Sequence, residues 1–79
     1  MNSTTQWLTA KRDRLADQLS PMIADMEEKK RRFNAMKEER DHMNKSPEGF
    51  YELGAELDAI KLEIRPLKRE LSIVEKLLK

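Results

Sequence analysis

The stretch Asn44-Lys45-Ser46-Pro47-Glu48-Gly49 decides the fold, because a chain of 79 residues with only two glycines and three prolines has one of each here. Ser46 is a suitable helix N-cap, and Pro47 fits the first helical position, where a missing backbone N–H has no cost. Glu48 complements the positive end of a helix. The stretch therefore predicts a turn over 44–49 and a second helix that starts at about residue 47.

Helical patterns extend from this turn in both directions. Upstream, the pattern reaches back to Ser3, which fits a capping box by accepting a hydrogen bond from the backbone N–H of Gln6. Downstream, it continues to Leu78. The sequence predicts a single domain over residues 1–79, with helices at about 3–45 and 47–78.

Two prolines fall inside the predicted helices. Pro21 and Pro66 each remove a backbone hydrogen bond, so each predicts a kink. For Pro21 there is an alternative, in which Ser20 caps a separate helix and residues 3–19 form a short helix of their own. The apolar pattern keeps its phase across Pro21, which favours the kink.

Composition restricts the class of protein. Sixteen Lys and Arg nearly cancel fifteen Asp and Glu, and cysteine is absent, which excludes disulfides and thiolate metal sites. Few turn residues disfavour an all-β fold. No apolar stretch approaches membrane-spanning length and no signal-peptide pattern is found, so we expect a cytoplasmic, all-α protein without membrane contact. So short a chain supplies little core and commonly needs a partner.

Apolar residues recur at alternating spacings of three and four in both helices, which is typical of a coiled-coil seam. Arg12, Lys29 and Arg40 are the polar residues at seam positions, and their long stems can lie along a seam. In the first helix the apolar seam residues are Leu8, Leu15, Leu19, Met22, Met26, Phe33, Met36 and Met43. In the second helix they are Phe50, Leu53, Leu57, Ile60, Ile64, Leu67, Leu71, Val74 and Leu78.

Folding the chain back at Ser46 brings every seam position opposite another one. The first pair after the turn is Met43 with Phe50, and the last is Leu15 with Leu78. The pairs between include Met36 with Leu57, Phe33 with Ile60, and Lys29 with Ile64. The agreement of seam and turn predicts an antiparallel two-helix coiled-coil hairpin.

Charges do not support this register. Arg32 would face Glu63 favourably, but Glu39 would face Glu56 and Asp25 would face Glu70. Exposed ion pairs contribute only about 0–1 kcal/mol, so packing outweighs them. A continuous helix that pairs between chains remains an alternative, which the turn at 44–49 disfavours.

Residues for catalysis or metal binding are scarce. His42 is the only histidine, it lies on the outer side of the first helix, and no Asp or Glu occupies a seam position. Without cysteine or a second histidine, neither a nucleophilic nor a metal site assembles easily. We therefore expect no enzyme, no metal, no cofactor and no small-molecule substrate.

The basic run Lys29-Lys30-Arg31-Arg32 raises the possibility of nucleic-acid binding, mainly through Lys30, Arg31 and Arg32. However, its side chains splay around more than one helical turn and the net charge is only +1. A solvated helix surface is the simpler interpretation. Nucleic acid is therefore an unfavoured partner.

A second apolar stripe follows the back of the second helix: Tyr51, Ala55, Ala59, Leu62, Pro66, Ile73 and Leu77. A helix that is apolar on two sides is normally covered on two sides, and a hairpin covers only one. This stripe predicts self-association as a dimer with four-helix character. Ile23 adds an apolar residue outside the seam of the first helix.

The predicted register leaves residues 1–14 without a partner, as a helical projection of about 21 Å. This segment carries Trp7, Leu8 and Arg12, and Trp and Arg are enriched at binding hot spots. The sequence thus predicts a non-enzymatic protein-interaction module, with Trp7, Leu8, Arg12, Ile23, Tyr51, Leu62, Ile73 and Leu77 at its interfaces. Two alternatives are a nucleic-acid-associated accessory protein and an architectural coiled-coil subunit of a larger complex.

Overall fold

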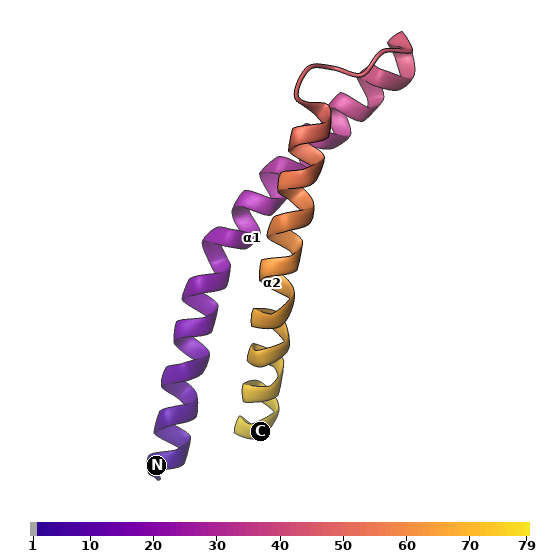
Figure 1. The fold of residues 1–79 in the computed structure, drawn as a ribbon. Helices are drawn as coiled ribbons and strands as arrows, with labels where there is room; N and C mark the ends of the chain where they lie inside the picture. Colours follow the sequence, from indigo (N-terminus) through magenta and orange to yellow (C-terminus); the bar gives the residue numbers. More distant parts are fainter. Residues whose placement is uncertain (1) are drawn as a thin grey trace.

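The computed structural model describes residues 2–79, which form two helices and no strand (Figure 1). Helix α1 spans Ser3–Met43 and helix α2 spans Phe50–Leu78. The chain folds back on itself, so that both termini lie at the same end of a rod of 61 × 17 × 15 Å. The prediction of an all-α helical hairpin is confirmed.

Helix α1 begins one residue earlier than the predicted cap at Ser3 implies. The N-cap is Asn2, whose side-chain oxygen accepts a hydrogen bond of 2.8 Å from the backbone N–H of Thr5. The backbone N–H of Gln6 donates to the carbonyl of Asn2. The predicted capping box at Ser3 is therefore wrong, because Asn2 supplies the same kind of oxygen acceptor one position earlier.

The loop over 44–49 ends one helix and starts the next with two residues of positive φ. Asn44 closes α1 in the left-handed region at φ 53°, and Gly49 precedes α2 at φ 83°. Pro47 is not helical; its carbonyl accepts a hydrogen bond from the N–H of Phe50. The predicted helix start at Ser46 and Pro47 is wrong, because these residues form a turn before α2.

Pro21 and Pro66 both lie on exposed sides of uninterrupted helices. The alternative in which Pro21 starts a separate helix is therefore wrong. Figure 1 shows α1 curving across α2 toward the loop. An exposed proline is tolerated at such positions because the hydrogen bond that it removes is on the side facing water.

The buried residues of both helices lie on the faces that meet. In α1 they are Leu8, Leu15 and Leu19; in α2 they are Phe50, Leu53, Leu57, Ile64 and Val74. Half-buried Met22, Met26, Phe33, Met36, Ile60, Leu67, Leu71 and Leu78 complete the contact. The core is one row of side chains per helix, and none of its residues is completely shielded from solvent.

The register of the two helices differs from the predicted one by about two helical turns, or ~10 Å at 1.5 Å per residue. Phe33 contacts Phe50 and lies beside Gly54, whereas the sequence placed it opposite Ile60. Leu15 clusters with Val74 rather than pairing only with the last residue of α2. Met43, predicted to face Phe50, is 67% exposed.

The loop explains this shift. Because α2 starts at Phe50 instead of residue 47, the loop turns back beside the end of α1, and the last turns of α1 extend past the start of α2 (Figure 1). The shift brings α2 alongside the N-terminal turns of α1. The predicted projection of residues 1–14 is therefore wrong: Leu8 is buried against α2, and Lys11 forms a salt bridge with Glu70 at 2.8 Å.

One packing contact is specific to the observed register. The rings of Phe33 and Phe50 stack with centroids 4.8 Å apart. A Cβ atom built on Gly54 would lie 3.1 Å from Cε2 of Phe33, closer than an ordinary van der Waals contact. The missing side chain at Gly54, which costs about 1 kcal/mol within a helix, thus makes room for the Phe33 ring.

We expect Gly54→Val to lower the free energy of unfolding by about 1–3 kcal/mol, because its methyl groups would displace the Phe33 ring. Urea denaturation followed by circular dichroism measures this change. Ala24→Val is the control, since Ala24 is exposed on α1. Helix propensity alone favours valine over glycine and disfavours it relative to alanine. An equal or larger loss in the control would contradict the packing argument.

Candidate protein interaction site

Large apolar side chains line the side of α2 that faces away from α1. Tyr51, Leu62, Ile73 and Leu77 are between 52% and 74% exposed. Ala55, Ala59 and Pro66 are exposed at helical spacing between them. We call these seven residues the outer face of α2. Because they lie opposite the seam on the same helix, no other part of the hairpin can cover them.

Two polar side chains bear on this face directly. Tyr51 packs its ring edge-on against Phe50, and its hydroxyl lies 3.4 Å from the hydroxyl of Ser46. Arg69 is the charged residue that interrupts the row between Pro66 and Ile73. A long arginine stem can lie along apolar surface while its guanidinium reaches water, so Arg69 does not prevent this face from being covered.

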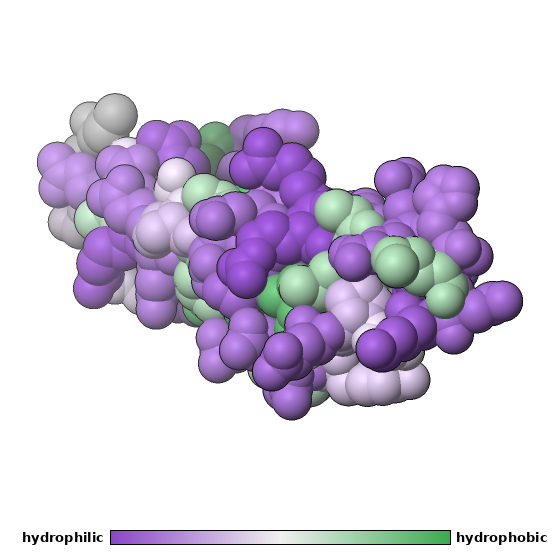
Figure 2. Space-filling view, turned by 90° about the horizontal axis from the view of Figure 1, so that it is seen from above, coloured by the Kyte–Doolittle hydropathy of each residue, from purple (hydrophilic) through white to green (hydrophobic). Residues whose placement is uncertain are grey.

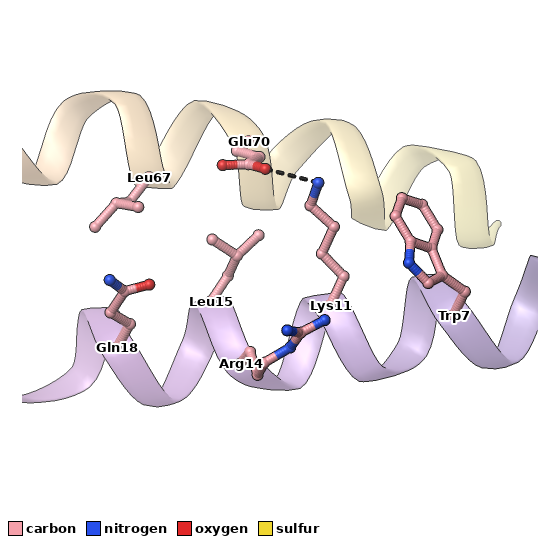
Figure 3. A pocket seen from close by; sticks show the side chains of 7 residues that line it. All are labelled: Trp7, Lys11, Arg14, Leu15, Gln18, Leu67 and Glu70. Atoms are coloured by element: carbon pink, nitrogen blue, oxygen red, sulfur yellow. Dashed lines mark ion pairs between the residues drawn. The ribbon is translucent and has the colours of Figure 1, made fainter.

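A second exposed aromatic residue, Trp7, borders a groove between the terminal turns of the two helices (Figure 3). The ammonium group of Lys11 lies 5.1 Å from the centre of the Trp7 ring and 2.8 Å from a carboxylate oxygen of Glu70. Figure 3 shows Leu15 and Leu67 pointing toward each other at the base of this groove. The indole is 57% exposed and is held by a cation that is itself held by α2.

The remaining predicted interface residues are less accessible. Leu8 belongs to the buried core with Leu15 and Val74, so its assignment to an interface is wrong. Arg12 and Ile23 are half-buried beside the seam. Trp7 and the four exposed large residues of α2 keep the accessibility that an interface requires.

The basic run 29–32 is divided among different sides of α1. Lys29 lies in the seam, where its side chain is only 20% exposed and its ammonium group donates to Asp25 at 2.8 Å. Lys30, Arg31 and Arg32 are exposed on three successive directions around the helix. The run therefore does not form one basic patch, which disfavours the nucleic-acid interpretation.

The environment of Lys29 favours its charged form. The hydrogen bond that Lys29 donates to Asp25 raises the pKa of Lys29 above its ordinary value of 10.5, and the negative charges of Asp25 and Glu56 add to the effect. Desolvation and the nearby Arg32 act in the opposite direction. A lysine is accommodated in the apolar seam because these two carboxylates, one from each helix, lie beside it.

A raised pKa of Lys29 in the folded state means that this interaction stabilises the fold below pH 10.5 and is lost as the pH rises through the folded-state value. We expect wild-type protein to be more stable than Asp25→Asn at pH 7, and this difference to shrink above pH 10.5. Urea denaturation of both proteins across this range measures it.

Lys29→Arg is the matched control for the pH experiment, because a guanidinium group stays charged throughout. The stability difference between Lys29→Arg and the double variant Lys29→Arg/Asp25→Asn should stay constant across the same range. If it shrinks as the wild-type difference does, the titrating group is not Lys29.

No cluster of potential metal ligands is found within residues 2–79. His42 is exposed near the end of α1, beside Glu38 and Asp41, and no group of three potential ligands lies close enough to hold a metal ion. Neither α1 nor α2 combines the length and the apolar character that a membrane crossing requires.

One row of charged residues was not predicted from the sequence. Lys61, Arg65 and Lys68 lie beside Ile64 and Met26 on one side of the hairpin. Their spacing of four and three residues places them in a row along one helix, which could have been read from the sequence. The overlooked row lies in α2, whereas the contiguous basic run 29–32 is in α1.

The end of the molecule that carries the loop is mostly hydrophilic. Figure 2 shows this end with separate green patches between larger purple areas. No broad apolar patch is visible in this view of the loop end.

No protein family model matches the chain, and comparisons with curated proteins and with solved structures find no similar one.

Proposed function

We propose that this protein is a non-enzymatic protein-interaction module of the assembly-factor, co-chaperone or inhibitor type, which pairs as a homodimer through the outer face of α2 and docks on another protein. The observation that supports this most is the row of large exposed side chains opposite the seam: Tyr51, Leu62, Ile73 and Leu77. Contiguous exposed apolar surface of this kind commonly marks an association site.

The amount of exposed surface also supports a partner. The accessible surface is 6210 Å², whereas a globular monomer of 9.3 kDa has about 5,000 Å². The excess of about 1,200 Å² is of the size that one partner commonly buries in a stable interface, roughly 800 Å². A dimer would cover much of what the thin rod leaves open.

The outer face of α2 is complementary to itself when two copies pack in opposite directions. With the two-fold axis crossing α2 at the level of residue 64, Tyr51 meets Leu77 of the other copy and Ala55 meets Ile73. Leu62 then meets Pro66, and the small Ala59 meets the long Arg69. Large residues thus lie opposite small ones along much of the helix, which suits ridges-into-grooves packing, and the same patch serves both copies as two-fold symmetry requires.

The resulting proposal is a four-helix dimer with the two α2 helices in the middle and the α1 helices outside. Within each hairpin, α1 and α2 would pack as an antiparallel coiled coil along the shared seam. Trp7 and its groove would remain accessible, because Trp7 lies on α1 and outside the face that pairs. Trp7 is therefore our candidate contact for the docking target.

Replacing apolar residues of the outer face with charged ones tests the dimer. We expect the double variant Leu62→Glu/Ile73→Glu to shift the protein from dimer to monomer while most of the helical signal remains, because unpaired charges in an interface cost several kcal/mol. Light scattering and circular dichroism at micromolar concentration measure the two quantities. Met43→Glu, at an equally exposed methionine off this face, should remain dimeric. A wild-type monomer would contradict the proposal.

The pairing direction has a separate test. We expect a mixture of Ala55→Cys and Ile73→Cys proteins to crosslink between unlike chains with a bismaleimide reagent that reaches the ~8–10 Å between packed helix axes. Each variant alone should crosslink to itself poorly, because in the antiparallel pairing two copies of residue 55 lie far apart. Efficient self-crosslinking of Ala55→Cys would indicate a parallel arrangement.

A further inference from the structure

One side of the hairpin carries a groove with an apolar floor. Two adjoining hollows lie along it, of about 360 and 220 Å³, and Lys68 borders both. Leu19, Leu71 and Ile23 line the first hollow, and Met26 and Ile64 line the second. We call this side of the hairpin the basic side, for the charges that follow.

Three cations line the groove, and the spacing along α1 places a fourth beside it. Lys61, Arg65 and Lys68 follow one another along α2. Lys30 comes seven residues after Ile23, two turns along the same side of α1, and Lys61 comes seven residues before Lys68. Because Ile23 and Lys68 share the first hollow, Lys30 and Lys61 lie opposite each other two turns closer to the loop. None of these four residues forms a salt bridge within residues 2–79.

On the opposite side of the hairpin, which we call the acidic side, α2 carries a row of carboxylates that face cations of α1 such as Lys11 and Arg14. Asp25 and Glu56 act together on Lys29, and Glu70 binds Lys11. Glu63 lies midway between Glu56 and Glu70 in the same row of α2. Glu27, Asp58 and Glu75 lie toward the edges and ends of the basic side, and Asp41 follows Lys30 by three turns on the same side of α1. Among the described residues, the cations of the basic side have no ion pair, whereas Lys11 and Lys29 are paired with carboxylates.

We propose that the basic side binds an acidic amphipathic helix from another protein. Apolar residues at helical spacing would enter the hollows over Leu19, Met26 and Ile64, and carboxylates on the flanks of that helix would meet Lys30, Lys61 and Lys68. This is the helix-in-groove mode of recognition, with charge complementarity fixing direction and register. The inference rests on the proposed function as an interaction module and goes beyond it, because it adds a second docking surface on the side of the hairpin opposite the Trp7 groove.

Two other occupants fit these charges less well. A second copy related by two-fold symmetry would place the same four cations against one another, and like charges in contact disfavour binding. Nucleic acid would be attracted by the cations, but its phosphate backbone has no apolar groups to bury in the hollows. Four cations also neutralise few phosphates. An acidic amphipathic helix would bury its apolar residues on the floor of the groove and would place its carboxylates beside the bordering cations.

The test uses the full chain and a fluorescein-labelled helical peptide of about 15 residues, with leucines at spacings of three and four and glutamates on both flanks. Fluorescence anisotropy measures its binding at low and at physiological salt. We expect saturable binding that weakens with salt, and at least a roughly tenfold loss of affinity in Lys61→Glu/Lys68→Glu. Lys45→Glu/Lys79→Glu, with the same change of net charge away from the groove, should bind within about twofold of wild type.

Two probe controls separate the occupants. A peptide of the same composition with scrambled leucine spacing should bind at least roughly tenfold more weakly, because its apolar residues cannot enter the hollows together. A 20-base-pair DNA duplex should compete poorly. Equal binding of the scrambled peptide, tighter binding of the duplex, or an equal loss in both charge-reversal variants would each overturn the proposal.

The dimer variant separates this proposal from the broader one. Leu62→Glu/Ile73→Glu changes the outer face of α2 and leaves the basic side intact, so it should bind the peptide as wild type does. If the peptide binds and no dimer forms, the homodimer is refuted and the acidic-helix site stands. If the wild-type protein forms a dimer and the peptide binds neither the wild type nor Leu62→Glu/Ile73→Glu, the acidic-helix site is refuted and the dimer stands.

Discussion

The position of Phe33 against Gly54 and Phe50 is the contact on which the other surfaces depend. The ring stacks on Phe50 at 4.8 Å and occupies the space that a side chain at residue 54 would fill, so α2 cannot slide along α1 without losing the contact. Fixing α2 in this way brings Lys11 to Glu70 and Ile23 to Lys68. The acidic and basic sides of the hairpin are therefore consequences of one register.

Periodicity in the sequence was sufficient for the elements and the contact faces, but not for the register. A slide of seven residues moves every seam position onto another seam position, so the apolar pattern fits both arrangements equally well. The helical hairpin was correctly predicted, whereas opposing Met43 to Phe50 was wrong. The registers differ in features outside the seam, namely the loop length, the glycine in α2 and the flanking charges.

Those features were visible in the sequence but had ambiguous meanings. Ser46-Pro47 matches a helix start as well as it matches a turn, and choosing the helix start placed α2 too early. The like-charge pair of Asp25 with Glu70 in the predicted register was a sign of error, because Glu70 instead binds Lys11. Gly54 was the clearest sign, since a glycine inside a regular helix suggests that something approaches it closely.

Two-fold symmetry explains why we propose different partners for the different sides of the hairpin. A closed two-fold dimer uses one patch twice, so the patch must be compatible with itself. The outer face of α2 meets this condition, because it is mostly apolar. When two copies run in opposite directions about the level of residue 64, several of its large residues meet small ones. The basic side does not meet this condition, because Lys61, Arg65 and Lys68 would face their own copies. The proposed homodimer and the proposed acidic partner would therefore occupy different sides of the hairpin, so neither would displace the other.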